Sequence, residues 1–163
     1  MMKAKKRVNI SKEEGSLIGW CEWVGLPEWN IPAMKAKMDS GAKTCALHAF
    51  YVEPFEKEGE PWVKFGIHAY DDAPETVNEC EAKVVDQRLV RDSGGHEEMR
   101  YVIMSICQLG DKVQEVQTTL TNRDAMQFPM LVGRNALKNG FLVDSGASYL
   151  LGKPKIDEQP RAC

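Results

Sequence analysis

Asp39, Ser40 and Gly41 follow one another directly after a run that alternates between apolar and polar residues, and this order could support acid–base chemistry. A hydroxyl and a glycine after an aspartate can fix its carboxylate, since glycine lets backbone N–H groups approach closely. Two such carboxylates about 3 Å apart share one proton, because two like charges at that distance cannot both ionise. One then takes a proton from a bound water while the other protonates a substrate carbonyl. Taken alone, Asp-Ser-Gly is also a common turn.

A second segment makes the chemical interpretation more specific. Residues 130–137 read Met-Leu-Val-Gly-Arg-Asn-Ala-Leu, with Gly140 shortly after them. This stretch resembles the apolar-apolar-Gly-Arg-Asn-x-Leu segment of retroviral proteases, which supplies a core strand under the active-site loop and a single short helix. Between the two segments, residues 92–96 read Asp-Ser-Gly-Gly-His, a hairpin signature. Retroviral proteases have their glycine-tipped flap at this place, so all three parts agree in order and spacing.

The chain more closely resembles a bacterial family long labelled ATP-dependent zinc proteases and now viewed as retropepsin-like aspartic proteases. The resemblance covers residues 18–153. The matching residues are Gly19–Val24 with Leu26 and Pro27, Ala36–Ala49, Met126, Pro129–Arg134 and Phe141–Asp144.

The resemblance implies a homodimer without a cofactor, in which each subunit gives one Asp39 to a shared dyad. Ser40 and Gly41 would complete the catalytic loop, and the two hairpins would close over a peptide or protein substrate. We expect the substrate to be bound by Ala42, Lys43, Gly94, Gly95 and Arg134. Family members often occur together with ATP-grasp ligases that add glutamate to proteins or peptides. Glutamate-rich substrates and an ATP-grasp glutamate ligase as partner follow from that association.

The sequence departs from these patterns at two positions. The family usually has Thr after the aspartate, and Ser40 keeps the hydroxyl. Retroviral enzymes have an acidic residue four places after the catalytic aspartate, where it pairs with the arginine of the Gly-Arg-Asn segment. Here that place is Lys43, which cannot pair with Arg134. Either Arg134 is tied to another carboxylate, or the pocket is positively charged and suits an acidic substrate.

Two other functions stay open. One is a non-catalytic binding or regulatory module that partners a glutamate ligase, with Asp39 in a structural role. The other is a zinc-dependent protease. The three histidines, His48, His68 and His96, form no HExxH pair, and the five scattered cysteines form no CxxC pair, so we expect no metal site.

Asp-Ser-Gly-Ala recurs at Asp144. Two such loops would suggest a two-lobed aspartic protease, but too little chain follows the second copy to build another lobe. We therefore expect it to be a turn within a terminal hairpin, with strands at 141–143 and 149–151.

Composition limits the classes of function. The 163 residues are 43% hydrophobic and 28% charged, with a net charge of -3, which indicates one globular domain and gives no electrostatic case for nucleic acid. No stretch approaches the roughly 20 apolar residues that span a bilayer, and the N-terminus lacks the apolar part of a secretory signal. We expect a cytoplasmic protein with reduced cysteines.

The remaining pattern predicts the elements that position Asp39. Runs with the period of strands occupy residues 17–24, 32–38, 44–52, 62–70, 81–91, 99–109 and 112–121, and 134–139 is the one predicted helix. Many short strands with turns between them indicate an all-β fold. Together with the resemblance, they predict a closed acid-protease (retropepsin-like) barrel of six to eight strands with one short C-terminal helix. We expect this domain to cover residues 17–153, between flexible segments at 1–16 and 154–163.

Overall fold

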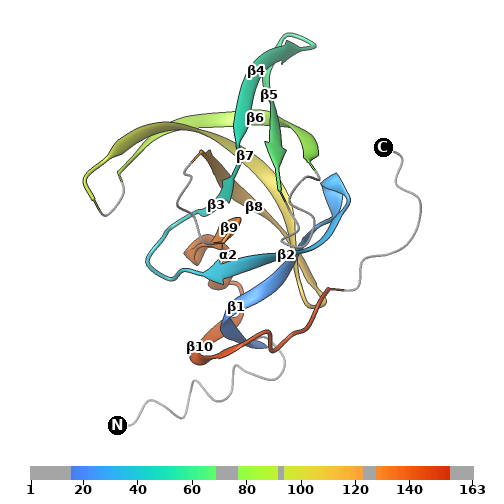
Figure 1. The fold of residues 1–163 in the computed structure, drawn as a ribbon, viewed down its shortest axis with the longest axis vertical. Coiled ribbons are helices and arrows are strands. Elements are labelled where there is room, and N and C mark those ends of the chain that lie inside the picture. The colour runs from blue at the N-terminus through green and yellow to red at the C-terminus, as the bar shows by residue number, and fades with distance from the viewer. Residues whose placement is uncertain (1–15, 69–76, 92–93, 123–127, 155–163) are drawn as a thin grey trace.

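The computed structural model describes residues 16–68, 77–91, 94–122 and 128–154, and their regular structure is almost entirely β (Figure 1). The elements in chain order are β1 (Ser16–Leu26), the 3-10 helix η1 (Pro27–Trp29), β2 (Ile31–Met38), β3 (Cys45–His48), β4 (Tyr51–Lys57), β5 (Glu60–Ile67), β6 (Asn78–Arg91), β7 (Glu97–Leu109), β8 (Lys112–Thr121), β9 (Met130–Val132), the helix α2 (Arg134–Leu137) and β10 (Phe141–Ser148). Neither helix is long and apolar enough to cross a membrane. The segments predicted to be flexible lie outside the described residues, apart from Ser16 in β1 and the buried Pro154.

The strands form one sheet in the order β10-β1-β2-β9-β3-β8-β7-β6-β5-β4. β1 also pairs with β7 at Gly25 and Gln108, so six of the strands (β1, β2, β9, β3, β8 and β7) close a ring. This confirms the predicted closed all-β fold with one short C-terminal α-helix. The closed ring has six strands, within the predicted range of six to eight, and the sheet of the described residues has ten in all. One reason for the larger count is that the run at 44–52 breaks at Ala49 into β3 and β4.

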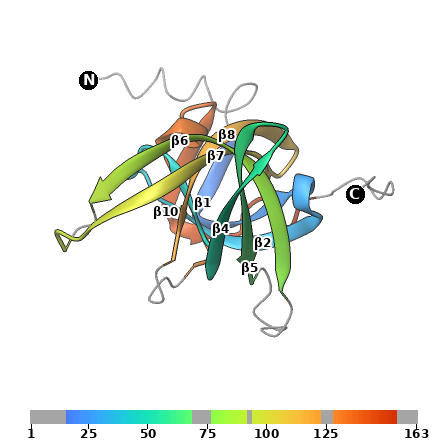
Figure 2. The ribbon, with the colours of Figure 1, turned by 90° about the horizontal axis from the view of Figure 1, so that it is seen from above.

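Two hairpins, β4–β5 and β6–β7, extend from the ring (Figures 1 and 2). β6 and β7 are the longest strands, with 14 and 13 residues. The pairing of β6 with β7 shifts between Val84 and Asp86, where β6 carries a bulge. At the tip, Gly95 has φ of 87°, as the sequence predicted for a glycine in this turn. Asp92 and Ser93 lie outside the described residues.

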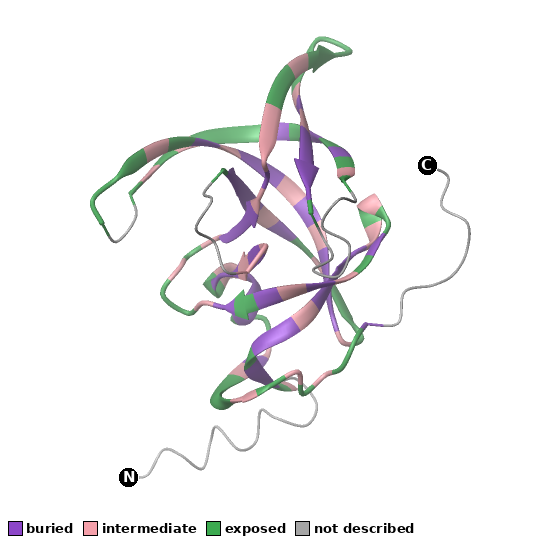
Figure 3. Cartoon of the chain, in the orientation of Figure 1, coloured by how far each residue is buried: buried purple, intermediate pink, exposed green. Residues whose placement is uncertain are grey.

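The interior of the ring is apolar, and exposed residues concentrate along the outer hairpins and loops (Figure 3). β2 shows how the sequence produces this arrangement. Met34, Ala36 and Met38 point into the core, while Lys35 and Lys37 between them point outward. Burial of a side chain the size of Met34 contributes roughly 2 kcal/mol to folding. The alternation therefore fixes which face of β2 is inside and brings the strand to its end directly before Asp39.

The predicted terminal hairpin was wrong. β10 is a single strand that runs parallel to β1, and the Asp-Ser-Gly-Ala copy lies inside it, at a bulge opposite Gly19 and Cys21. After β10, Tyr149 has φ of 55°, which is not a strand conformation, and the next two N–H groups bond to a side chain. The carboxylate of Glu22, fully buried, accepts hydrogen bonds from the backbone of Leu150 at 2.9 Å and Leu151 at 3.2 Å.

Candidate active site

Asp39 is held by its own backbone and by the end of β9. β2 pairs with β9 as far as Met38 and Val132, and the N–H of Asp39 continues this pairing with a 2.8 Å bond to the carbonyl of Val132. The chain then turns, with the N–H of Ala42 donating to the carbonyl of Asp39 at 3.2 Å. Within the turn, the N–H of Gly41 donates to Asp39 Oδ1 at 3.0 Å. The half-buried carboxylate is thus oriented at the end of a rigid strand, as the sequence predicted.

The start of α2 braces the loop from its other side. The N–H groups of Arg134 and Asn135 donate to the carbonyls of Ala42 at 2.8 Å and Lys43 at 2.9 Å. These N–H groups lie in the first turn of the helix, where the helix itself offers them no acceptor. The guanidinium of Arg134 adds a 3.0 Å bond from Nη1 to the carbonyl of Ser40. The segment that resembles the Gly-Arg-Asn motif therefore fixes the shape of the Asp39 loop.

Gly133 lets the two segments approach closely. A Cβ at this position would lie 2.4 Å from the carbonyl oxygen of Thr44 and 2.9 Å from that of Ala42. Any larger residue would push the Asp39 loop away from β9. Beneath the loop, burial raises the pKa of the Cys45 thiol, although the N–H of Gly133 acts in the opposite direction.

The structure brings together six of the predicted site residues, Asp39, Ser40, Gly41, Ala42, Lys43 and Arg134. Arg134 is bonded to a backbone carbonyl, and no carboxylate of the described residues forms an ion pair with Lys43 or Arg134. Lys37, which was not predicted as a site residue, is likewise exposed and has no such partner in the described part of the chain. The sequence could have indicated Lys37, because residues two apart on a strand point to the same side and Lys37 lies two residues before Asp39. The loop thus contains one such cation, Lys43, with Lys37 in the strand before it and Arg134 in α2.

The other two predicted substrate-binding residues, Gly94 and Gly95, lie at the tip of the β6–β7 hairpin. The tip and the loop between β2 and β3 project on the same side of the ring (Figures 1 and 2). The tip is exposed.

The chain supplies one aspartate to this loop. Among the described residues, the hydrogen-bond partner of the Asp39 carboxylate is the N–H of Gly41, and no second carboxylate is bonded to it. Asp144 makes the same local contact, accepting from the N–H of Gly146 at 2.9 Å, but it lies exposed on β10. A shared-proton dyad requires a second carboxylate close to the first.

No group of three or more His, Cys, Asp or Glu side chains within the described ranges is arranged to hold a metal ion. The three histidines lie on different elements, with His48 in β3, His68 just after β5 and His96 just before β7.

Known proteins resemble the chain both in sequence and in fold. A protein named probable alpha-L-glutamate ligase from Shewanella pealeana (strain ATCC 700345 / ANG-SQ1) is 47% identical over 137 residues, which are 84% of this chain and 30% of that protein. One of the same name from Parasynechococcus marenigrum (strain WH8102) is 41% identical over 87% of this chain and 30% of its own length. The chain thus spans less than a third of these curated relatives.

A structural-genomics crystal structure of a Legionella pneumophila protein of unknown function matches the fold with a TM-score of 0.71 and 28% identity. The match covers 83% of this chain and 98% of the other. The sequence signature of the RimB-like family, described as retropepsin-like aspartic endopeptidase RimB, matches residues 17–154. The chain therefore belongs to the RimB-like family of retropepsin-like aspartic endopeptidases.

Proposed function

We propose that the protein is an aspartic peptidase that acts as a homodimer, with one Asp39 from each subunit in a shared dyad. The observation that carries the proposal is the Asp39 loop itself. A half-buried aspartate stands at the end of β2, its Oδ1 is held by the N–H of Gly41, and α2 braces the loop from behind. One such aspartate per chain matches an enzyme that completes its site by dimerisation.

In this mechanism a water lies between the two Asp39 carboxylates, which share one proton. The ionised carboxylate takes a proton from the water, whose oxygen attacks the peptide carbonyl carbon, and the protonated carboxyl gives its proton to the carbonyl oxygen. In the collapse of the tetrahedral intermediate, the carboxyl that took the proton from water gives it to the nitrogen as the C–N bond breaks. The other carboxylate takes a proton back from a hydroxyl of the intermediate, so that the product carboxylic acid forms and the dyad again holds one proton. Ser40 and Gly41 keep the loop in shape, and the hairpin tip with Gly94 and Gly95 covers the substrate.

We further propose that the substrates are acidic peptides, such as glutamate-rich or ligase-modified proteins. Lys37 and Lys43 lie within four positions of Asp39 in the chain, and Arg134 is bonded to the carbonyl of Ser40. None of the three has a carboxylate partner among the described residues, so their charges are available to acidic side chains. The relatives named glutamate ligase contain a region like this chain within much longer proteins. An ATP-grasp glutamate ligase is therefore the proposed partner. With four buried free cysteines, the protein suits the reducing cytoplasm.

The first experiment is cleavage of peptides that contain runs of glutamate. The wild type should cleave them, Asp39→Asn should not, and a chelator should have no effect. Asp144→Asn is the matched control, because it changes the same tripeptide with the same local hydrogen bond on β10. It should keep full activity. If Asp144→Asn is as inactive as Asp39→Asn, a dyad within one chain replaces the dimeric one, and loss of activity with the chelator points to a zinc enzyme.

Mixing experiments test the shared site directly. In an equal mixture with Asp39→Asn at fixed total concentration, random pairing leaves about a quarter of the dimers fully wild type. Activity should fall to about a quarter of the pure wild type, whereas independent subunits would retain about half.

The second candidate function is a non-catalytic module that binds a glutamate ligase. Its supporting observation is the presence of a similar region inside ligase-named chains. A strictly monomeric protein at micromolar concentration that cleaves no peptide would favour this function, since a specific dimer interface should persist there.

A further inference from the structure

One face of the sheet leads without interruption from the Asp39 loop to the β6–β7 hairpin. Residues directly opposite each other on paired strands share a face. Leu131 of β9 is opposite Ala46 of β3, Ala46 is opposite Thr119 of β8, and Thr119 is opposite Val102 of β7. Ala46, Thr119 and Val102 are small and buried, and Leu131 is half-buried, next to the residue whose carbonyl holds Asp39.

Two arginines stand at the far end of this face. Arg100 lies two residues from Val102 along β7, toward the hairpin tip, and therefore on the same side of the sheet. Arg88 of β6 is directly opposite Arg100. Like charges opposite each other on a sheet are destabilising, so such a pair needs a reason.

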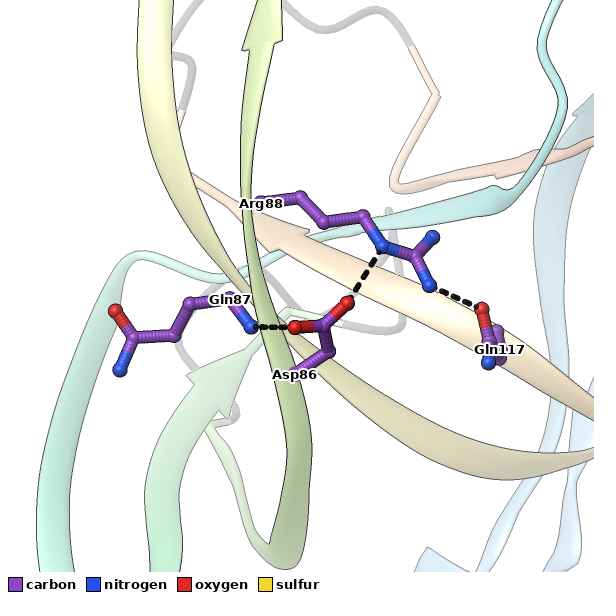
Figure 4. A network of polar contacts seen from close by, with 4 residues as sticks. All are labelled: Asp86, Gln87, Arg88 and Gln117. Carbon is purple, nitrogen blue, oxygen red and sulfur yellow. Dashed lines mark hydrogen bonds and ion pairs between the residues drawn. The ribbon is translucent and has the colours of Figure 1, made fainter.

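Each arginine is held by a carboxylate through one edge of its guanidinium. Asp86 Oδ2 accepts from Arg88 Nε at 2.9 Å, and Arg88 Nη2 donates to Gln117 Oε1 at 2.8 Å (Figure 4). Arg100, 9% exposed, donates from Nε to Glu98, which is fixed in turn by a 3.0 Å bond from Thr121.

Each of the two guanidinium groups has terminal N–H donors that make no hydrogen bond within the described residues. Among the described residues, neither terminal nitrogen of Arg100 and only one of Arg88 has a hydrogen-bond acceptor. The N–H donors of a planar guanidinium are spaced to bond to the two oxygens of one carboxylate, and here two oriented guanidinium groups lie on opposing residues.

We infer that Arg88 and Arg100 form a carboxylate-binding subsite for the substrate, at a distance from the bond that is cleaved. The inference rests on the proposed function, because it assigns the two arginines to the bound peptide. Asp86 and Glu98 balance the two positive charges, so the subsite selects carboxylates by directed hydrogen bonds and not by net charge. Three strand spacings of about 4.8 Å separate β9 from β7. Val102 is thus roughly 14 Å from Leu131 along the sheet, the length of about four extended residues. The subsite lies beyond Val102, because Arg100 is two residues further along β7 and Arg88 is one strand further.

Binding can be tested apart from catalysis in the inactive Asp39→Asn protein. A hexamer of glutamate and a hexamer of glutamine are titrated into it, and the ratio of the two Kd values is measured. The glutamate peptide should bind at least about tenfold more tightly, and Arg88→Gln should weaken its binding by about tenfold while leaving the glutamine peptide unaffected. Arg91→Gln is the matched control on the same strand, because Arg91 is exposed and its side chain points to the other face. It should leave both affinities unchanged.

Arg88 carries the test because it is partly exposed and its replacement should leave the fold intact, which circular dichroism checks. Arg100→Lys keeps the charge of the buried position and removes the fork, and it should lower the preference for glutamate as well. Equal affinity for the two peptides, no binding of either at millimolar concentration, or an unchanged preference in Arg88→Gln would each overturn the inference. Preferential binding without cleavage by the wild type would refute the peptidase and leave the subsite standing. Cleavage by the wild type, with equal affinity of the Asp39→Asn protein for the glutamate and glutamine peptides, would support the peptidase and refute the subsite.

Discussion

Replacing Gly133 by alanine tests whether the approach of β9 to the Asp39 loop is as close as the structure shows. The added Cβ would lie 2.4 Å from the carbonyl oxygen of Thr44, 2.7 Å from its carbon and 2.9 Å from the oxygen of Ala42. All three are backbone atoms, so no side chain can rotate away. Gly133 has φ of -93° and ψ of -178°, which alanine adopts without strain, and the effect is therefore purely steric.

The cost follows from the contacts that must shift. Overpacking costs about 1–3 kcal/mol, and weakening the bonds from Arg134 and Asn135 to the loop costs about 1 kcal/mol each. The reduced freedom of the unfolded chain offsets about 0.4–1 kcal/mol. The free energy of unfolding should fall by about 2–5 kcal/mol. With a urea dependence of roughly 2 kcal/mol per molar, the midpoint should fall by about 1–2.5 M.

Urea unfolding followed by tryptophan fluorescence, at one protein concentration for all variants, measures this change. Gly146→Ala is the control, because its Cβ would lie 3.5 Å from Asp144 Oδ1, an ordinary contact, in the copy of the motif on β10. It should be neutral or more stable by about 0.5 kcal/mol. At Gly41 the Cβ would lie 3.3 Å from Asp39 Oδ1, so Gly41→Ala should lose peptidase activity and little stability. An unchanged urea midpoint for Gly133→Ala would refute the reasoning.

Two further predictions concern buried ionisable groups. Glu22→Gln should lower the free energy of unfolding by about 2–3 kcal/mol in the same assay, because its amide cannot accept all three backbone N–H groups that the carboxylate accepts; the exposed Glu56→Gln should change it little. Burial raises the pKa of Cys80 to about 12 and raises that of Cys107, so the folded state holds these protons more tightly than the unfolded state. Their contribution is complete below the unfolded pKa of about 8.5 and is lost as the pH rises toward 12. The urea midpoint should therefore fall between pH 8 and pH 11, and less steeply in Cys80→Ala; an equal slope in both proteins would contradict the assignment.

The part of the site that could be predicted from sequence is the part built from local rules. The alternation of β2 set its inward face, and the residues after it predicted the turn that presents Asp39. The Gly-Arg-Asn segment predicted the short helix, which ends at Leu137 and is followed by Gly140 at φ of 103°. Each of these features depends on neighbours within a few residues, so a pattern of residue types contains it.

The part that could not be predicted depends on contacts between distant segments. Glu22 lies in an apolar strand and has the residue type of an exposed position, yet it is fully buried. It is tolerated there because Gly19, Leu150 and Leu151 direct their N–H groups at its carboxylate. Two of these donors are more than 120 positions away in sequence, so neither the burial of Glu22 nor the parallel course of β10 follows from a local pattern.

The arginine pair shows how a single residue of register decides what a surface can recognise. The bulge between Val84 and Asp86 adds one residue to β6 relative to β7. Without it, every side chain of β6 beyond the bulge would change sides, since successive residues of a strand point to opposite faces. Arg88 would then leave the face that leads to Asp39, and its neighbour Gln87 would lie opposite Arg100. The presence of Arg88 and Arg100 in the sequence therefore does not predict that the two side chains lie opposite each other. The bulge places them together, and an acidic substrate would depend on it as much as on the arginines themselves.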